Sequence, residues 1–305
     1  MCCLFGFVDY AGSLSVKQKN RLIRELSIAA EARGTDATGI AYNTSRGLQI
    51  YKRPLAAHRL HLRIPAEAHV VLGHTRMTTQ GSAKKNFNNH PFLGHVKGES
   101  FALAHNGVIW NDLELRRTKH LPRTKVQTDS YIAVQLIERQ NALNLSSLKC
   151  MAEQVEGSFS FSVLSEQDEL WLVKGDNPLT IAYFPKVGVY VYASTAEILN
   201  KALARCGNWL GRREKVDIAM GDIVKIDSKG RITHGTFDVS KFYRSSWGYW
   251  DVPLYPRLPQ SEEEHLSLLK SVAKALGFTG EMIDRLLEQG FSTDDIEELL
   301  YEGVY

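Results

Sequence analysis

Short apolar runs, each bounded by polar or turn-forming residues, recur along the first 240 residues and limit the possible folds most strongly. Cys3–Val8, His69–Gly73, Phe101–Ala104 and Ser158–Leu164 have the length of strands. Several strands are apolar at consecutive positions, which indicates that both of their faces are buried. We therefore expect a mixed helix and strand protein in which a sheet is sandwiched between other layers.

Further segments complete this pattern. Val16–Ala32 carries apolar side chains along one helical stripe, and Gly39–Tyr42 with Leu48–Tyr51 is typical of a hairpin. The other expected elements are strands at Leu170–Val173, Leu179–Phe184 and Gly188–Ala193, helices at Asp129–Arg139 and Thr195–Ala204, and a hairpin of Asp222–Ile226 with Arg231–His234.

The composition is that of a globular protein. The 305 residues are 44% hydrophobic and 23% charged, with a net charge of +3, which argues against dominant disorder. No run approaches 18 apolar residues, so no membrane span is predicted, and four cysteines are too few for a disulfide-framed mini-protein. The first residues lack the basic region of a secretory signal, so we expect a cytoplasmic protein.

The charge is divided unevenly between two parts of the chain. Residues 261–305 carry a net charge of −8, which leaves +11 on the first 260 residues. The stretch from 237 to 260, rich in proline and aromatic residues, is predicted to be a linker. Beyond it we expect an acidic three-helix module at 261–305 that serves docking or oligomerisation, or alternatively packs on the chain's own body.

Cys2 becomes the first residue if Met1 is removed, which is plausible because cysteine is small. It would then combine a thiol with an α-amine whose reference pKa is about 7.7–8.0, low enough for the amine to accept the thiol proton. Such a residue is a nucleophile with its own base. The alternative is that Cys2 and Cys3 simply begin a buried strand.

Several short motifs follow this cysteine in a fixed order and point to one family. They are Met1-Cys2-x-x-Phe5-Gly6, then residues 33–39, 73–81, 104–107 and 127–130, followed by 156–161 and 221–223. Together they resemble the glutaminase domain of class II glutamine amidotransferases, the N-terminal nucleophile (Ntn) type, over roughly residues 2–236. The resemblance implies an α+β fold, a four-layer αββα Ntn-hydrolase sandwich, followed here by a small C-terminal helical module.

The resemblance also implies a reaction and its residues. Cys2 attacks the side-chain amide of L-glutamine, forms a thioester and releases ammonia, and water then releases glutamate. Asn106 and Gly107 match the oxyanion hole, Arg76 the clamp on the substrate carboxylate, and Asp129 the partner of the substrate ammonium. Thr79 and Gln80 belong to the substrate-binding loop.

Taken singly, these residues have simpler explanations. Asn106-Gly107 is the commonest signal for a type I′ turn, Arg76 could be a surface ion-pair partner, and Asp129 could favour a helix N-terminus. Arg33-Gly34-x-Asp36 is expected to serve structure near the site, with Gly34 in a left-handed turn.

The sequence departs from the family pattern at two points. Met77-Thr78-Thr79-Gln80-Gly81 stands where several members have Trp-Ala-Thr-His-Gly, and Cys3 follows the nucleophile where glycine is common. Because few residues follow the domain, we expect the ammonia acceptor to be a synthase in trans. Two alternatives stay open: a non-catalytic glutamine-sensing or scaffold module, and an Ntn amide hydrolase with another substrate.

No cofactor and no metal are expected. Residues 58–105 contain seven histidines, but no cysteine pair or carboxylate joins them at a recognised zinc spacing. The basic run from Arg116 to Lys125 is interpreted as a solvated loop, although it could contact a phosphate-bearing partner. It contains no aromatic residue, so nucleic-acid binding is not expected.

Overall fold

The computed structural model describes residues 2–240, 266, 269–270, 273, 279–293 and 296. The chain divides into two compact units, Met1–Ser245 and Ser246–Tyr305. In the part of the chain described, no helix has both the length and the apolar character that crossing a bilayer requires.

Two antiparallel sheets form the centre of the first unit. The first sheet, in the order β11-β9-β10-β1-β4-β2-β3, is built around β1 (Cys3–Asp9), which pairs with two neighbours. Its other strands are β2 (Ala37–Thr44), β3 (Gly47–Arg53), β4 (Val70–Arg76), β9 (Thr180–Phe184), β10 (Val189–Ala193) and β11 (Glu214–Val216). The second sheet, in the order β13-β12-β8-β7-β6-β5, comprises β5 (Phe92–Val96), β6 (Glu99–Ile109), β7 (Gly157–Ser165), β8 (Leu170–Lys174), β12 (Asp222–Ile226) and β13 (Ile232–Thr236).

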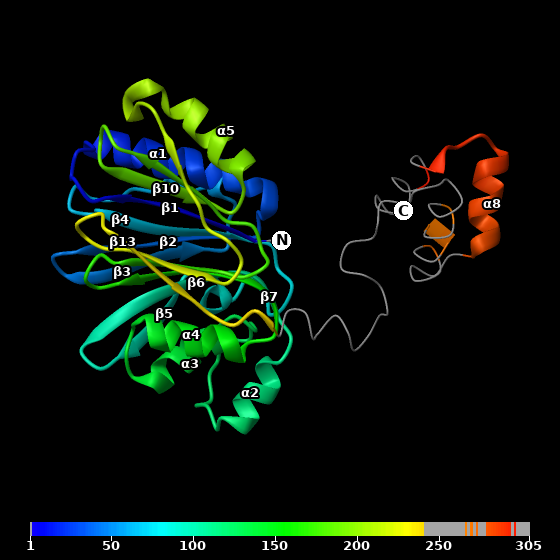
Figure 1. Cartoon of the computed structure of the whole chain (residues 1–305), viewed down its shortest axis with the longest axis horizontal. Coiled ribbons are helices and arrows are strands. Elements are labelled where there is room, and N and C mark those ends of the chain that lie inside the picture. Colours follow the sequence, from blue (N-terminus) through cyan, green and yellow to red (C-terminus); the bar gives the residue numbers. More distant parts are fainter. Residues whose placement is uncertain are drawn as a thin grey trace. The chain divides into compact units, whose positions relative to one another are not determined.

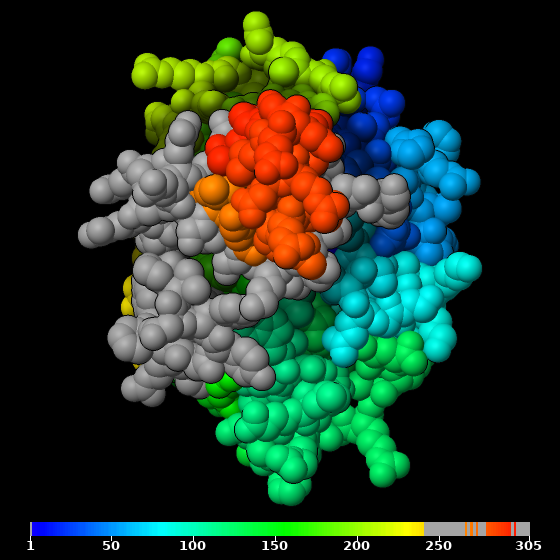
Figure 2. Space-filling model, turned by 90° about the vertical axis from the view of Figure 1, so that its right-hand side faces the viewer, coloured from blue at the N-terminus to red at the C-terminus, as the bar shows by residue number. Residues whose placement is uncertain are grey.

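Helices cover the outer face of each sheet. Figure 1 shows α1 (Val16–Ala30) and α5 (Ala196–Cys206) on one side, and α3 (Tyr131–Gln140) and α4 (Leu145–Gln154) on the other. In the space-filling view α5 lies at one edge of this body and the segment around residue 120 at the opposite edge (Figure 2). A further helix, α2 (Asp112–Thr118), follows β6.

Three apolar clusters correspond to the three contacts between these four layers. Phe5 and Phe7 of β1 pack with Leu22 and Leu26 beneath α1 and α5. Side chains of α3 and α4 pack on the outer face of the second sheet, and the third cluster, which includes Leu4, lies between the sheets. Consecutive residues of β1 thus bury both faces, as the apolar runs predicted. The α+β, αββα sandwich is confirmed.

Most predicted elements of the body appear, with shifted ends. The first helix ends at Ala30 instead of Ala32 and continues as a 3-10 turn, Glu31–Arg33. The interpretation of 116–125 as a loop is wrong in part, because Arg116 and Arg117 belong to α2. The sequence analysis missed β5, α2, α4 and β11; the remaining short elements are 3-10 turns at Ala57–Arg59, Asn86–Asn88 and Asn208–Leu210.

The second unit is described in part. Its helix α8 (Gly280–Glu288) lies within the segment predicted to be a three-helix module, and Ile283 packs with Ala273 and Ile296. The predicted linker lies outside the described residues from 241 to 260, as do most of the other residues of the predicted module. The three-helix module remains a prediction.

Candidate functional site

Cys2 lies where β1 begins, beside the end of β4. The register pairs Cys3 with Thr75, which brings Cys2 next to Arg76. Side chains alternate along a strand. Cys3 points into the cluster beneath α1 and Leu4 into the cluster between the sheets, so Cys2 faces the second sheet. Its Sγ lies 3.5 Å from the carbonyl oxygen of Met77.

The two adjacent thiols differ in environment. Burial raises the pKa of the Cys2 thiol, and the positive charge of Arg76 acts in the opposite direction. Burial raises the pKa of Cys3 to about 11, against the lowering effect of hydrogen bonds from Ser194. Cys3 therefore stays protonated at neutral pH, and Cys2 needs a base to become a thiolate.

The Arg76 guanidinium is buried and held by three acceptors. Its Nη1 donates to Asn89 Oδ1 at 2.7 Å, and its Nη2 donates to the carbonyls of Gln80 and Gly81. A guanidinium has five N–H groups, so one on Nε and one on Nη1 remain for a further ligand. The surface ion-pair explanation of Arg76 is therefore wrong: Arg76 is only 2% exposed.

Asp129 lies just before α3 and faces the end of β6. Its carboxylate accepts a hydrogen bond from the Ile109 N–H at 2.6 Å, and its own N–H donates to Gln80 Oε1 at 2.9 Å. Asp129 interacts electrostatically with both Cys2 and Arg76, so the three side chains share one neighbourhood. Thr79, in the same loop as Gln80, is exposed.

Asn106 and Gly107 lie inside a strand and do not form a turn. They pair with Ser160 and Phe159 in the β6–β7 ladder, so the type I′ alternative is wrong. Asn106 is fully buried, and its Oδ1 has no hydrogen-bond partner among the described residues. Gly107 has a φ of +145°, and a Cβ there would lie 1.8 Å from the Ser158 carbonyl oxygen. Only glycine lets the two strands approach this closely.

Residues 33–36 support the backbone around Cys2. Arg33 Nε donates to the Cys2 carbonyl at 2.9 Å, and Asp36 accepts from the Thr78 N–H at 2.7 Å. The left-handed conformation predicted for Gly34 is wrong, because its φ of 172° is extended. Glycine is needed there for a different reason: a Cβ would lie 2.4 Å from the Arg76 carbonyl carbon.

Three of the seven histidines, His74, His90 and His105, are buried close to one another. The His90 ring packs between those of His74, at 4.1 Å between ring centroids, and Phe92, at 4.4 Å, tilted against both. His74 Nε2 lies 2.9 Å from the carbonyl of His105, whose Nδ1 lies 2.8 Å from Ser130 Oγ. Burial lowers the pKa of His74 to about 3 and that of His90 well below its usual range, so both rings are neutral. Within the described residues, no group of three or more His, Cys, Asp or Glu side chains is placed to hold a metal ion.

Two residues around the site were missed by the sequence analysis. Asn177 Nδ2 donates to the Asn106 carbonyl at 3.1 Å, and Ser194 contacts both Leu4 and Asn106. These contacts join segments up to 190 residues apart, and neither residue carries a local signal. The topology alone brings them together.

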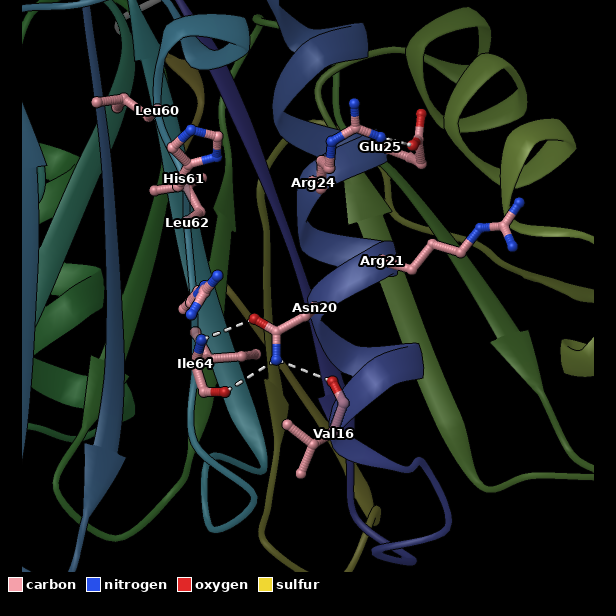
Figure 3. Close-up of a pocket in the computed structure, with 10 residues that line it drawn as sticks. Val16, Asn20, Arg21, Arg24, Glu25, Leu60, His61, Leu62 and Ile64 are labelled. Carbon is pink, nitrogen blue, oxygen red and sulfur yellow. Dashed lines mark hydrogen bonds and ion pairs between the residues drawn. The ribbon is translucent and has the colours of Figure 1, made fainter.

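A separate hollow of about 590 Å³ lies between α1 and the segment 60–64 (Figure 3). The Asn20 side chain forms one wall by binding the N–H and the carbonyl of Ile64. The nearby guanidinium of Arg21 donates to the Arg205 carbonyl, and that of Arg24 pairs with Glu25. None of the predicted site residues lines this hollow, so it is distinct from the neighbourhood of Cys2.

Comparisons with known proteins show which proteins this chain resembles. Residues 74–201 match a family model described as a glutamine amidotransferase domain. Glutamine–fructose-6-phosphate aminotransferase of Halalkalibacterium halodurans is 31% identical over 198 residues, which cover 63% of this chain and 32% of that protein. 7-Cyano-7-deazaguanine synthase of Saccharolobus solfataricus is 30% identical over 57% of this chain and 39% of its own length. The chain thus spans about a third of the length of these curated relatives.

Solved structures share the fold. Glutamine phosphoribosylpyrophosphate amidotransferase from B. subtilis superposes with a TM-score of 0.60 at 19% identity, over 90% of this chain and 58% of that one. A structure described as the allosteric regulatory enzyme of purine biosynthesis gives a TM-score of 0.61 at 18% identity, with the same coverage. The body has the fold of Ntn amidotransferase domains, and the resemblance drawn from the motifs is confirmed.

Proposed function

We propose that this glutamine amidotransferase domain hydrolyses the side-chain amide of L-glutamine through a thioester on Cys2. The observation that supports it most is the meeting of Cys2, Arg76 and Asp129 at one end of the sandwich, within mutual electrostatic reach. These groups supply a nucleophile, a carboxylate clamp and an ammonium partner. Recognition of both ends of a free amino acid leaves its side-chain amide directed at the thiol.

Removal of Met1 precedes the reaction and gives Cys2 a free α-amine. The amine takes the thiol proton, and the thiolate adds to the amide carbon. The oxygen of the tetrahedral intermediate is stabilised by the Asn106 side-chain amide and the Gly107 N–H. Collapse breaks the C–N bond, and the departing nitrogen takes the proton from the α-amine and leaves as ammonia. Water then hydrolyses the thioester to glutamate and the free thiol.

The raised pKa of Cys2 fits a nucleophile that depends on its own amine. A thiol that is mostly protonated at neutral pH reacts only when a base lies beside it. Arg76 and Asp129 support the substrate part of the proposal. Each retains hydrogen-bonding capacity beyond its contacts with the described residues.

The test combines mass spectrometry with turnover. The purified chain is weighed before and after 6-diazo-5-oxo-L-norleucine, and glutamate release from glutamine is measured. We expect loss of Met1, one adduct on Cys2, and turnover that Cys2→Ala abolishes. Cys3→Ala is the matched control, because its thiol faces the opposite side of β1, and it should retain turnover.

Other outcomes identify the alternatives. Retained Met1, no adduct and glutamine binding without turnover would establish a glutamine-sensing or scaffold module. Turnover of other amides in preference to glutamine would establish a different Ntn amide hydrolase. Turnover that persists in Cys2→Ala would reject the thioester mechanism.

The acceptor of the ammonia is a further part of the proposal. We infer a synthase partner in trans and a cytoplasmic setting, where the four cysteines, all free in the structure, stay reduced. The relatives are named for two different products, a property that is consistent with one type of glutaminase domain serving several acceptors. Release of glutamate and free ammonia in equal amounts by the isolated chain would show that hydrolysis does not require the acceptor.

A further inference from the structure

Ser194 joins the start of β1 to Asn106. It follows β10 and is fully buried. Its N–H donates to the Leu4 carbonyl at 2.9 Å, and its Oγ accepts from the Leu4 N–H at 2.9 Å. The same Oγ lies 3.4 Å from Asn106 Nδ2. One side chain therefore touches both the backbone that carries Cys2 and the side chain proposed to stabilise the oxyanion.

The hydrogen bonding of the Asn106 amide is incomplete. Its Nδ2 donates to Ser194 across a distance near the upper limit for a hydrogen bond, and its Oδ1 is buried without a partner among the described residues. A buried amide oxygen without a donor is costly, so this orientation of the amide is disfavoured.

Rotation of the amide by 180° about its last bond gives Oδ1 a donor and leaves the two N–H groups of Nδ2 for a ligand. Ser194 Oγ already accepts the Leu4 N–H and still has one proton to donate. After rotation, Asn106 Oδ1 faces that proton and both N–H groups of Nδ2 point away from Ser194. The Cys3 thiol also lies within hydrogen-bonding reach of Ser194, but sulfur is a weaker acceptor than an amide oxygen.

The rest of Asn106 is fixed, so the amide is the part that can move. The backbone of Asn106 pairs with Ser160 in the β6–β7 ladder, and its carbonyl accepts from Asn177. Asn177 is fixed in turn by donating to Ser158 Oγ at 2.7 Å. Rotation of the terminal amide therefore requires no change in the strands.

We propose that Ser194 is a positioning residue: its hydroxyl donates to Asn106 Oδ1 in the substrate complex and directs Nδ2 at the developing oxyanion. This inference rests on the proposed function. An oxyanion exists only after the thiolate has attacked, so the effect of Ser194 is on the rate of the chemical step. Substrate binding through Arg76 and Asp129 does not depend on it.

The test compares Ser194→Ala with Thr195→Ala. Thr195 caps α5 through a hydrogen bond to the Ile198 N–H, so its variant removes a neighbouring hydroxyl with no contact to Asn106. For Ser194→Ala we expect kcat to fall by about 10- to 100-fold, less than the roughly 100- to 1000-fold of losing an oxyanion donor outright. We expect KM for glutamine within about threefold of wild type, and Thr195→Ala close to wild type in kcat.

Two further measurements separate positioning from a general structural role. L-Glutamate γ-semialdehyde forms a tetrahedral adduct with the thiol, so its Ki should rise in parallel with the loss of kcat, while the Kd of glutamate stays unchanged. In an Asn106→Ala background, Ser194→Ala should cause no further loss, because residues that act as a unit are not additive. Equal additional loss in both backgrounds would overturn the inference.

Ser194→Cys carries the test if Ser194→Ala does not fold. It fills the space with a slightly larger side chain and replaces the hydroxyl by a weak donor, so kcat should fall between the values for serine and Asn106→Ala. Wild-type kcat in either Ser194 variant would overturn the inference while leaving the proposed function intact. Failure of the wild-type chain to hydrolyse glutamine would instead overturn the proposed function, and this inference with it.

Discussion

The side-chain oxygen of Gln80 accepts a hydrogen bond from the backbone N–H of Asp129 at 2.9 Å. The main-chain carbonyl of the same glutamine accepts from Arg76 Nη2. Gln80 thus connects the two residues proposed to bind the opposite ends of glutamine, one from the loop after β4 and the other from the start of α3. The distance between the carboxylate and ammonium sites depends on this bridge.

Gln80→Ala should weaken substrate binding more than chemistry. The change removes the acceptor of the Asp129 N–H and loosens the start of α3, while the carbonyl that holds Arg76 remains. We expect KM for glutamine to rise about tenfold, equivalent to about 1.4 kcal/mol, with kcat within about threefold. Steady-state kinetics check this, with Thr78→Ala as the control in the same exposed loop. A fall in kcat at constant KM would contradict the assigned role.

Gly107→Ala should disrupt the β6–β7 pair. Its Cβ would lie 1.8 Å from the Ser158 carbonyl oxygen, in a backbone conformation with φ of +145°. Gly98 is a matched control, because its φ of +88° is also positive but, apart from its chain neighbours, no described residue has an atom within 4 Å of an added Cβ. Gly98→Ala should cost only the conformational term of about 1–2 kcal/mol, and Gly107→Ala more than about 4 kcal/mol. Urea unfolding measures both, and equal losses would show that the strands relax without strain.

The layered fold was predictable because its signal is local. β1 has apolar residues on both faces, and this property alone requires a layer above and below. α2 was missed because it is short and largely polar, whereas α4 was missed although it is as long as α3 and half of its residues are apolar. The end of α2 was interpreted as part of a basic run, and the start of α4 has a capping box formed by Asn144 and Ser147.

The site was predictable only where its residues carry a motif. Asn106-Gly107 has the same local appearance in a turn and in a strand, and pairing with β7 decides between them. Ser194 and Asn177 carry no motif, since their roles arise from distant contacts. Ser194 contacts Leu4, 190 positions away, and Asn177 contacts Asn106, 71 positions away. The conformation of Gly34 was also predicted wrongly. The backbone that approaches it belongs to Arg76 in β4, which is distant in the sequence.

His90→Phe should stabilise the protein in mild acid. Both ring nitrogens of His90 are buried without a partner among the described residues, and burial keeps its pKa well below 6.5. The unfolded chain binds a proton below about pH 6.5 that the folded chain does not bind, so stability falls as pH falls through this range. Phenylalanine has no such proton and keeps an aromatic ring between His74 and Phe92.

Urea unfolding at pH 7.5 and pH 5 checks this effect. Relative to wild type, the free energy of unfolding of His90→Phe should gain up to about 2 kcal/mol between the two pH values. The gain arises below about pH 6.5, over roughly 1.5 pH units at about 1.4 kcal/mol each. His95→Phe is the control, because His95 is exposed. An equal pH dependence in wild type and His90→Phe would mean that His90 is protonated in the folded protein.

Lys19→Met should be among the most destabilising changes in the first helix. Lys19 Nζ lies 3.3 Å from Asp9 Oδ2 and donates to the carbonyls of Ala66 and Ala68, and both charged side chains are buried. Methionine leaves the Asp9 carboxylate without its counterion, supported by the N–H groups of Ser13 and Leu14. Removing one partner of a buried pair typically costs about 3–5 kcal/mol.

The matched control is Lys17→Met, since Lys17 is exposed on the same helix and should change stability by less than about 0.5 kcal/mol. Adding Asp9→Asn to Lys19→Met removes the stranded charge and keeps one of the two oxygens that accept from Ser13 and Leu14, so it should recover part of the loss. Urea unfolding of the four proteins measures these differences. If Lys19→Met and Lys17→Met lose equal stability, the Asp9 charge is solvated in the folded protein, and the pair does not hold the end of β1 to α1.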